Sequence, residues 1–358
     1  MLNSMLSGDF PRSRALAVLL VLITLVLAVV PFVFSGARPL NTAATICVFI
    51  VLVASYDLLL GYTGIVSFAH TMFYGIGAYG VGLALAGMGS TWWAVCVGTF
   101  AALGVSLVLA LVIGLFSLRV RAIFYAMITL AVAAAFAVLA SQMSDFTGGE
   151  DGKTFRVPEL LSPAFNLIDG EFLGRAIDGK LITYYLVFVA SVFLFLVMLR
   201  IVNSPFGRVL QAIRENDFRA EALGYRIVIY RTIANCLGAL IATLAGVLMA
   251  LWLRYVGPKT MLSFEVMTDI LLIVVIGGMG TLYGAVVGSA LFIIAQNYLQ
   301  TLMQQASSAL EGVPLLPHLF HPDRWMLWLG LLFILSVYFF PTGIVGKLRA
   351  GALARKRG

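Results

Sequence analysis

Charged side chains are scarce in this chain. Asp, Glu, Lys and Arg make up 11% of its 358 residues, whereas the apolar types make up 61%. A soluble domain carries about 25% charged residues, so this chain has too few to cover a surface that faces water. The scarcity excludes a soluble domain and predicts a polytopic membrane protein.

Cysteine is also rare, and its placement excludes a disulfide framework. Cys47, Cys96 and Cys236 each lie inside an apolar run, where a thiol packs as a small apolar side chain. No spacing of His, Cys, Asp or Glu resembles a metal site, and no set of residues resembles an activated nucleophile. We therefore expect no metal and no cofactor on this chain, and an integral-membrane enzyme is its least supported class.

The chain has no G-x-x-x-x-G-K-[ST] loop, so it does not bind and hydrolyse a nucleotide by itself. If it is an active transporter, its energy comes from an ion gradient or from a partner. A secondary transporter or channel acting alone is one alternative, although such proteins usually bury more charge than this sequence offers. A partner-driven transporter is the other alternative, and it requires a docking surface on an inner loop.

Long apolar runs fill most of the chain and predict about ten membrane-spanning helices. The first run is too long for the apolar core of a signal peptide and lacks a clear cleavage site, so we expect a retained span. The run 266–303 is too long for one crossing at about 1.5 Å per residue and predicts two helices separated by glycines. The expected spans are 15–34, 40–60, 71–87, 91–115, 120–141, 181–201, 232–253, two within 266–303, and 324–340.

The sign of the loop charges predicts the orientation. Residues 142–180 carry seven acidic and four basic side chains, whereas residues 203–231 carry three acidic and five basic ones. Because basic loops stay on the inner side of the membrane, the first loop belongs outside and the second inside. This rule also explains the net charge of +7 without a nucleic acid. We expect one membrane domain over 1–358, with 1–14, 202–231 and 341–358 inside and 142–180 outside.

The inner loop predicts two short amphipathic helices. Ser204 can cap a helix that begins at Pro205, where a missing N–H costs nothing. Asn216 or Asp217 can begin a second helix, and Gly224 favours a left-handed stop. The apolar face of the first helix is expected to consist of Phe206, Val209, Leu210 and Ile213.

Two glycine-rich breaks interrupt the apolar runs, at 61–70 and at 277–284. Irregular backbone inside a membrane is tolerated where it is buried in protein or lines a watery cavity, and broken transporter helices use such ends to guide substrate. Both breaks are therefore expected to flank a translocation path, and the alternative is close helix packing through small residues. The candidate path residues are Gly61, Gly64, Ser67, His70, Gly75, Gly277, Gly278, Gly280, Thr281, Tyr283 and Asp269.

Few ionisable side chains lie near these breaks. Charges inside a membrane are costly and by default suggest function. Asp57, His70 and Glu265 are interpreted as lying near the membrane surface, and Asp269 as the one placed well inside the apolar stretch.

Five motifs are spread over nearly the whole chain. The inner loop has Glu221-Ala222 and Gly224 after SPFGR and AIREN, and the other motifs are GYTGIVSFAHTMFYGIGAYG (61–80), TGGEDG (147–152), GGMGTLYGAVVG (277–288) and FFPTGIVG (339–346). The loop resembles the cytoplasmic coupling loop of ATP-binding-cassette (ABC) transporter permeases. Together the motifs resemble one family of these, the branched-chain amino acid permease subunits of the LivM type. One departure is the acidic pair Glu150-Asp151.

The resemblance implies a multi-pass subunit of the bacterial inner membrane, surrounded by lipid, with both termini cytoplasmic. Its implied partners are a sister permease of the LivH type, two cytoplasmic ATPases that bind ATP and Mg, and a periplasmic substrate-binding protein. The residues implied to couple the chain to the ATPases are Arg214, Glu215, Asp217, Glu221, Ala222 and Gly224. Similar scaffolds carry urea, short amides or aromatic acids, so these remain alternatives to branched-chain amino acids.

Overall fold

The computed structural model describes residues 14–34, 36–117, 122–172, 175–309 and 321–354. The predicted N-terminal segment 1–14 lies outside the described residues, except for Arg14. Within the described part, the predicted all-α polytopic fold is confirmed, because ten helical segments are long and apolar enough to cross a membrane.

The membrane-spanning helices follow the predicted apolar runs closely. They are α2 (Arg14–Val33), α3 (Ala37–Thr63), α4 (His70–Met88), α5 (Trp92–Ser117), α6 (Ala122–Gln142), α8 (Gly179–Val202), α11 (Ile227–Leu253), α13 (Phe264–Gly277), α14 (Leu282–Ala309) and α16 (Trp325–Phe339). The segments that contain α13 and α16 reach spanning length only together with adjoining short helices, over Pro258–Gly277 and Pro322–Arg349. The long run near 266–303 is divided at the predicted glycines, since α13 ends at Gly277 and α14 begins at Leu282.

Helix α3 forms the centre of the core and packs against α11, α14 and α8, while α4 packs against α11 and α5. Small residues permit the closest of these approaches. A Cβ at Gly77 of α4 would collide with the Thr243 backbone of α11, and one at Gly246 would collide with the Tyr74 backbone. Close backbone approach through small residues is the usual way in which membrane helices associate, because lipid provides little hydrophobic drive between them.

One end of the molecule carries the short strands, which the sequence did not predict. Strand β1 (Lys153–Thr154) pairs with β4 (Tyr255–Val256), and β2 (Asn166–Phe172) pairs with β3 (Arg175–Asp178). The short helices α7 (Ser144–Thr147), η1 (Gly149–Asp151), η2 (Glu159–Leu161) and α12 (Pro258–Met261) lie in the same loops, and η3 (Pro322–Arg324) precedes α16. The loop 142–180 is therefore folded onto the ends of the spans, even though it has little periodicity.

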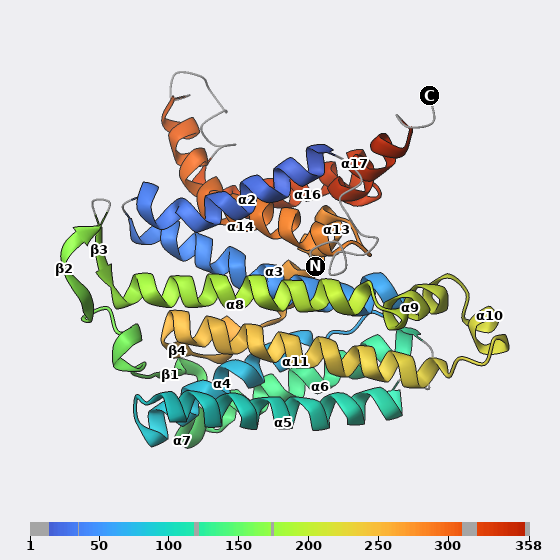
Figure 1. The fold of residues 1–358 in the computed structure, drawn as a ribbon, viewed down its shortest axis with the longest axis horizontal. Helices are drawn as coiled ribbons and strands as arrows, with labels where there is room; N and C mark the ends of the chain where they lie inside the picture. The colour runs from blue at the N-terminus through green and yellow to red at the C-terminus, as the bar shows by residue number, and fades with distance from the viewer. Residues whose placement is uncertain (1–13, 35, 118–121, 173–174, 310–320, 355–358) are drawn as a thin grey trace.

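The opposite end carries the predicted helix pair, α9 (Pro205–Glu215) and α10 (Asp217–Ala222), which project beyond the spans (Figure 1). Ser204 accepts a hydrogen bond from the amide of Gly207, and Asn216 accepts one from the amide of Arg219, so both predicted caps are confirmed. Gly224 has a φ of 90°, as predicted for a left-handed stop. The predicted tail 341–358 includes a further helix, α17 (Gly343–Ala354), which packs on α13 and α14.

Candidate functional site

The two glycine-rich breaks lie against each other. A Cβ added to Gly61, at the end of α3, would collide with the Asp57 carboxylate and with the backbone nitrogen of Gly280. Gly280 has a φ of 80°, in the left-handed region that glycine adopts most easily. A Cβ at Gly280 would in turn lie 3.0 Å from the carbonyl oxygen of Gly61. We call the set of Asp57, Gly61, Arg214 and Gly280 the glycine junction.

The Asp57 carboxylate joins α3 to the beginning of α14. Its Oδ1 accepts a hydrogen bond of 2.9 Å from the backbone amide of Gly280, and Asp57 is 2% exposed. The amides before a helix have no partner within that helix and carry partial positive charge, so a carboxylate stabilises them. Here the carboxylate comes from another helix, 223 residues earlier in the chain.

Arg214 joins the inner helix pair to the same place. Its Nη1 donates a hydrogen bond to the carbonyl oxygen of Gly61, within the last turn of α3. The carbonyls of a last turn lack helical partners and favour a cation. Arg214, which was predicted from the resemblance to face an ATPase, therefore directs its guanidinium toward the membrane domain.

The rest of the first break is partly buried and is held by several hydrogen bonds. Ile65, Ser67 and Ala69 are buried, whereas Gly64 is exposed. The amide of Phe68 donates to Thr129 Oγ1 of α6 at 3.0 Å, and the amide of Ala69 donates to Ser67 Oγ at 3.4 Å. His70 Nε2 lies 2.8 Å from Ser55 Oγ. These bonds pair part of the irregular backbone with protein groups, as irregular backbone at membrane depth requires.

His70 also packs against α3. Its ring meets the ring of Tyr56 edge-on, with 5.2 Å between centroids, and His70 is 1% exposed. Gly64 has a φ of 73° and ends α3. Gly75 of α4 leaves room for the side chain of Leu262, with which a Cβ there would collide.

The second break packs against α17. A Cβ at Gly278 would lie 2.9 Å from the carbonyl oxygen of Thr342, and Thr281 Oγ1 donates to the carbonyl of Gly278 at 2.8 Å. A Cβ at Gly277 would collide with the backbone of Gly284. The predicted glycines of both breaks are thus sites of close packing, which was the alternative interpretation. Their position on a translocation path stays a prediction.

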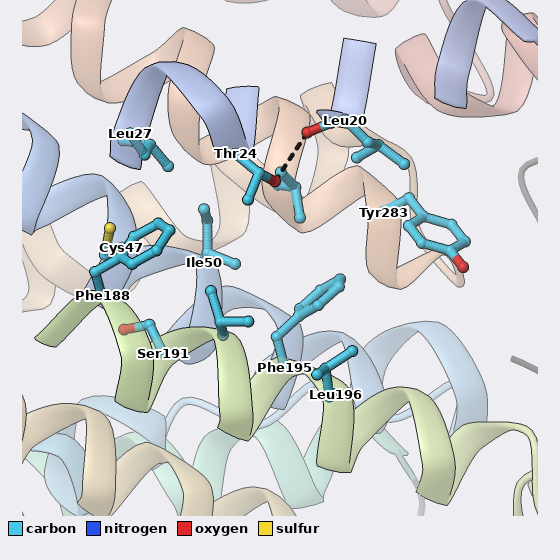
Figure 2. Close-up of a pocket in the computed structure, with 12 residues that line it drawn as sticks. Leu20, Thr24, Leu27, Cys47, Ile50, Phe188, Ser191, Phe195, Leu196 and Tyr283 are labelled. Atoms are coloured by element: carbon cyan, nitrogen blue, oxygen red, sulfur yellow. Dashed lines mark hydrogen bonds between the residues drawn. The ribbon is translucent and has the colours of Figure 1, made fainter. Parts of the chain in front are cut away.

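Tyr283 follows this break directly and lies at a cavity of about 270 Å³ (Figure 2). The cavity lies between α2, α3, α8 and α14, and its wall is almost entirely apolar. Its polar side chains are few: the Thr24 hydroxyl is bound to the carbonyl of Leu20 at 2.9 Å, and Ser191 lies on α8 (Figure 2). The lining contains no carboxylate, amine or guanidinium, so the cavity offers no partner for a charged group.

The ionisable residues near the breaks differ in how far the protein encloses them. Asp269 is partly exposed, and its Oδ2 accepts a hydrogen bond of 3.3 Å from Gln296. Asp57 and His70 are buried in the protein core. Their expected depth in the membrane stays a prediction. Asp57 is buried because α3 is central in the fold, and the central position of α3 was not visible in its apolar pattern.

Helix α10 is fixed by an ion pair and presents apolar side chains to solvent. Asp217 binds Arg231 at the start of α11 through both carboxylate oxygens, each 3.0 Å from Nη2. Phe218 is 86% exposed and Leu223 is 72% exposed. The sequence prediction did not include these two residues. The exposed residues among the predicted coupling residues are Arg214, Glu215, Glu221, Ala222 and Gly224.

Within the described residues, no three His, Cys, Asp or Glu side chains lie close enough to hold a metal ion. The described residues combine ten candidate spans, two interlocked breaks and a projecting helix pair connected to them, an arrangement that fits a membrane transport protein of the permease class. The family described as the permease component of the branched-chain amino acid transport system matches residues 38–337. The chain belongs to this family.

Known relatives agree with the assignment. The high-affinity branched-chain amino acid transport system permease protein LivM of Salmonella typhimurium is 27% identical over 312 residues, which cover 84% of this chain and 72% of the relative. The LivM protein of Escherichia coli is 27% identical over 315 residues, with the same coverage. A probable LivM permease of Methanocaldococcus jannaschii is 27% identical over 218 residues, covering 60% of this chain and 58% of the relative. No solved structure matches the chain.

The chain is therefore a permease subunit of an ABC importer, and a transport subunit rather than an enzyme. It is a multi-pass protein of the inner membrane. It works within an ABC transport system that includes partner subunits.

Proposed function

We propose that this chain imports branched-chain amino acids together with a LivH-type sister permease, two cytoplasmic ATPases and a periplasmic substrate-binding protein. The names of the relatives support this substrate class. In this proposal the chain has no nucleotide site of its own, and ATP and Mg bind to the ATPases. The helix pair α9–α10 and both termini are cytoplasmic, and the strands face the periplasm.

The observation that carries the proposal is the surface of α10. Phe218 and Leu223 expose large apolar side chains at the end of a projecting helix pair. Exposed apolar side chains within a charged rim are typical of protein–protein contacts. Because Asp217 and Arg231 fix α10 to α11, a force applied to Phe218 is passed on to a spanning helix.

The coupling surface is proposed to consist of Phe218 and Leu223 with the charged and small residues around them. Glu215 and Glu221 supply charge at its rim, and Ala222 and Gly224 let a partner approach closely. Arg214 and Asp217 belong to the same element but act on its inner side, where they bind Gly61 and Arg231.

The proposed path runs beside the two breaks. Tyr283 and the start of α14 move whenever the second break moves, so they are placed to open or close a passage. The remaining predicted path residues are proposed as the packing that allows these movements: Gly61, Gly64, Ser67, His70, Gly75, Gly277, Gly278, Gly280 and Thr281, with Asp269 on α13.

Replacing Phe218 tests the coupling surface. In Phe218→Ala, the complete transporter should bind its ATPases about tenfold or more weakly, because an anchoring aromatic residue is lost. Uptake into proteoliposomes should fall accordingly. Phe100→Ala is the matched control, since Phe100 is 73% exposed on the apolar span α5. If both variants retain full ATPase binding and uptake, α10 is not the coupling surface.

Competition tests the substrate class. Uptake of radiolabelled leucine by the reconstituted transporter with its binding protein should be blocked by unlabelled isoleucine and valine. Urea, acetamide and benzoate should leave it unchanged. Preferential competition by any of these three would assign the alternative substrate class.

A further inference from the structure

The two oxygens of the buried Asp57 carboxylate are held differently. Oδ1 is bound to the Gly280 amide, and the backbone of Thr281 also faces the carboxylate, whereas Oδ2 is buried and completes no hydrogen bond among the described residues. A carboxylate oxygen removed from water without a partner is costly. Such a group in a protein that must change shape suggests a second partner in another conformation.

A suitable partner lies at the same junction. Arg214 Nη1 binds the carbonyl oxygen of Gly61, which lies one helical turn after Asp57 on α3. The position that a Gly61 Cβ would fill borders the Asp57 carboxylate, and the equivalent position at Gly280 lies 2.7 Å from Arg214 Nη1. The Asp57 carboxyl group and the Arg214 guanidinium both border the contact between Gly61 and Gly280, but no direct ion pair joins them in the described conformation.

The two hydrogen bonds of the junction hold different moving parts. The bond from Gly280 to Asp57 fixes the start of α14 to α3, and the bond from Arg214 to Gly61 fixes α9 to α3. Helix α9 adjoins α10, whose outer surface is the proposed coupling surface. A movement of α9 therefore displaces Arg214 relative to α3 first. Any effect on the second break follows from that displacement.

We propose that Asp57 and Arg214 form a two-position latch that links the coupling helices to the start of α14. In the described position, Arg214 binds the Gly61 carbonyl and Asp57 holds the Gly280 amide. In the second position, the displacement of α9 brings the guanidinium onto the Asp57 carboxylate as an ion pair, and the Gly280 amide is released. The proposal rests on the proposed coupling role of α9 and α10.

Gly61 has a defined role in this exchange. Its missing side chain lets the Asp57 carboxylate and the Gly280 amide meet against the last turn of α3, since a Cβ at this position would collide with both. A guanidinium can serve both positions because it donates several hydrogen bonds from one plane and prefers a carboxylate when one is available. Lysine at 214 would provide charge without this geometry.

Release of Gly280 has a direct consequence for the cavity. Tyr283 lies in the first turn of α14 and forms part of the cavity wall that faces α2 and α8 (Figure 2). When the start of α14 is free, Tyr283 can shift relative to α8. The latch therefore connects the position of α9 to the shape of the space between α2, α8 and α14, and Asp57 and Arg214 act as positioning residues for transport.

The first test compares coupling in the complete reconstituted transporter. We expect Asp57→Asn and Arg214→Gln each to lower leucine uptake per ATP hydrolysed by about tenfold, and the double variant to be no worse than the more affected single variant, since residues of one unit are not additive. Arg208→Gln is the matched control, because Arg208 is exposed on the same helix and lies outside the junction. The proposal is overturned if uptake and ATP hydrolysis fall in parallel, or if the two single effects multiply in the double variant.

The second test measures the movement without relying on uptake. Spin labels at Ala212→Cys and Met279→Cys, with the exposed Cys96 changed to Ala, report the distance between α9 and the second break. This distance should change between the nucleotide-free and ATP-trapped transporter, and Asp57→Asn should abolish the change while Arg208→Gln retains it. An unaltered change in Asp57→Asn contradicts the latch. A wrong substrate assignment would instead abolish wild-type leucine uptake and leave these distances intact.

Discussion

Helices α2 and α3 follow one another in the chain and pack together, yet protein buries one of them far more than the other. In α3, 89% of the residues in the apolar window are buried in protein, against 17% in α2. The mean hydropathy of that window is 2.3 in α3 and 3.1 in α2. The more hydrophobic helix is therefore the one that the described part of this chain covers less. The helix that carries Ser55, Asp57 and Thr63 must be surrounded by protein, because only protein can pair those groups.

The two helices are also held differently. Helix α3 is fixed by close packing on every side and by the glycine junction, whereas α2 is flanked by two apolar cavities. Pro31 lies inside α2 and has no N–H to offer to the carbonyl of Leu27, four residues earlier. The hydroxyl of Tyr184 on α8 donates to this carbonyl, and the hydroxyl of Tyr185 donates to the carbonyl of Ala28 at 2.8 Å. The two tyrosines thus bind α2 to α8 at the turn where Pro31 interrupts the backbone hydrogen bonds of α2.

The largest expected effect comes from filling the space at Gly61. Gly61→Val would place a branched side chain against the Asp57 carboxylate and the Gly280 backbone, so we expect no correctly folded protein and no uptake. Gly104→Val is the matched control, because no atom lies within 4 Å of a Cβ at Gly104 on α5. Monodispersity in detergent and uptake into proteoliposomes measure both variants. A folded and active Gly61→Val protein would show that α3 is less tightly constrained than the contacts indicate.

A smaller effect is expected from removing one leucine side chain from each helix. Leu52 of α3 is 0% exposed, and Leu52→Ala should destabilise the protein by about 2 kcal/mol or more, because it leaves a cavity. Leu25 of α2 is 59% exposed, and Leu25→Ala should change stability by less than about 0.5 kcal/mol. Unfolding by denaturant in detergent micelles measures the difference. Equal losses in the two variants would remove the distinction between core and lipid-facing helix.

The smallest effect is expected at the attachment of α2. Tyr184→Phe removes the donor to the Leu27 carbonyl, and hydrogen bonds between membrane helices contribute on average about 0.6 kcal/mol. The Tyr184→Phe protein should remain folded. Proteolysis or chemical labelling of α2 should become faster than in the wild type, and that of the other helices should stay unchanged. Tyr338→Phe serves as the control, since Tyr338 is 78% exposed on α16. If the control shows the same labelling, the hydroxyl of Tyr184 does not hold α2.

Much of the fold could be predicted from the sequence because it follows from local patterns. The apolar runs gave the spans, since a hydrocarbon core of about 30 Å requires helices of that length. The ends of α9 and α10 were predictable from Ser204, Pro205, Asn216 and Gly224, because caps and left-handed stops depend on a few neighbouring residues. The strands of the loop 142–180 were missed because each is short and pairs through tertiary context.

The candidate site was predictable only in part. The breaks were recognised because glycine clusters are unusual between apolar runs. The exposure of Phe218 was missed, since nothing local distinguishes an exposed aromatic residue from a buried one on a six-residue helix. The burial of Asp57 within the protein was not predicted, because it depends on how α11, α14 and α8 pack around α3.

The sequence alone predicted about ten helices long and apolar enough to span a membrane, as the described residues contain, and the two breaks with their glycines. Length, hydropathy and backbone freedom are properties of short segments. The tertiary structure alone decided that Gly61 and Gly280 meet, that Asp57 holds the start of α14, and that Arg214 reaches the end of α3. These contacts join residues that are 153 and 223 positions apart in the chain. Such pairings are set by how whole helices pack, and no local pattern encodes them.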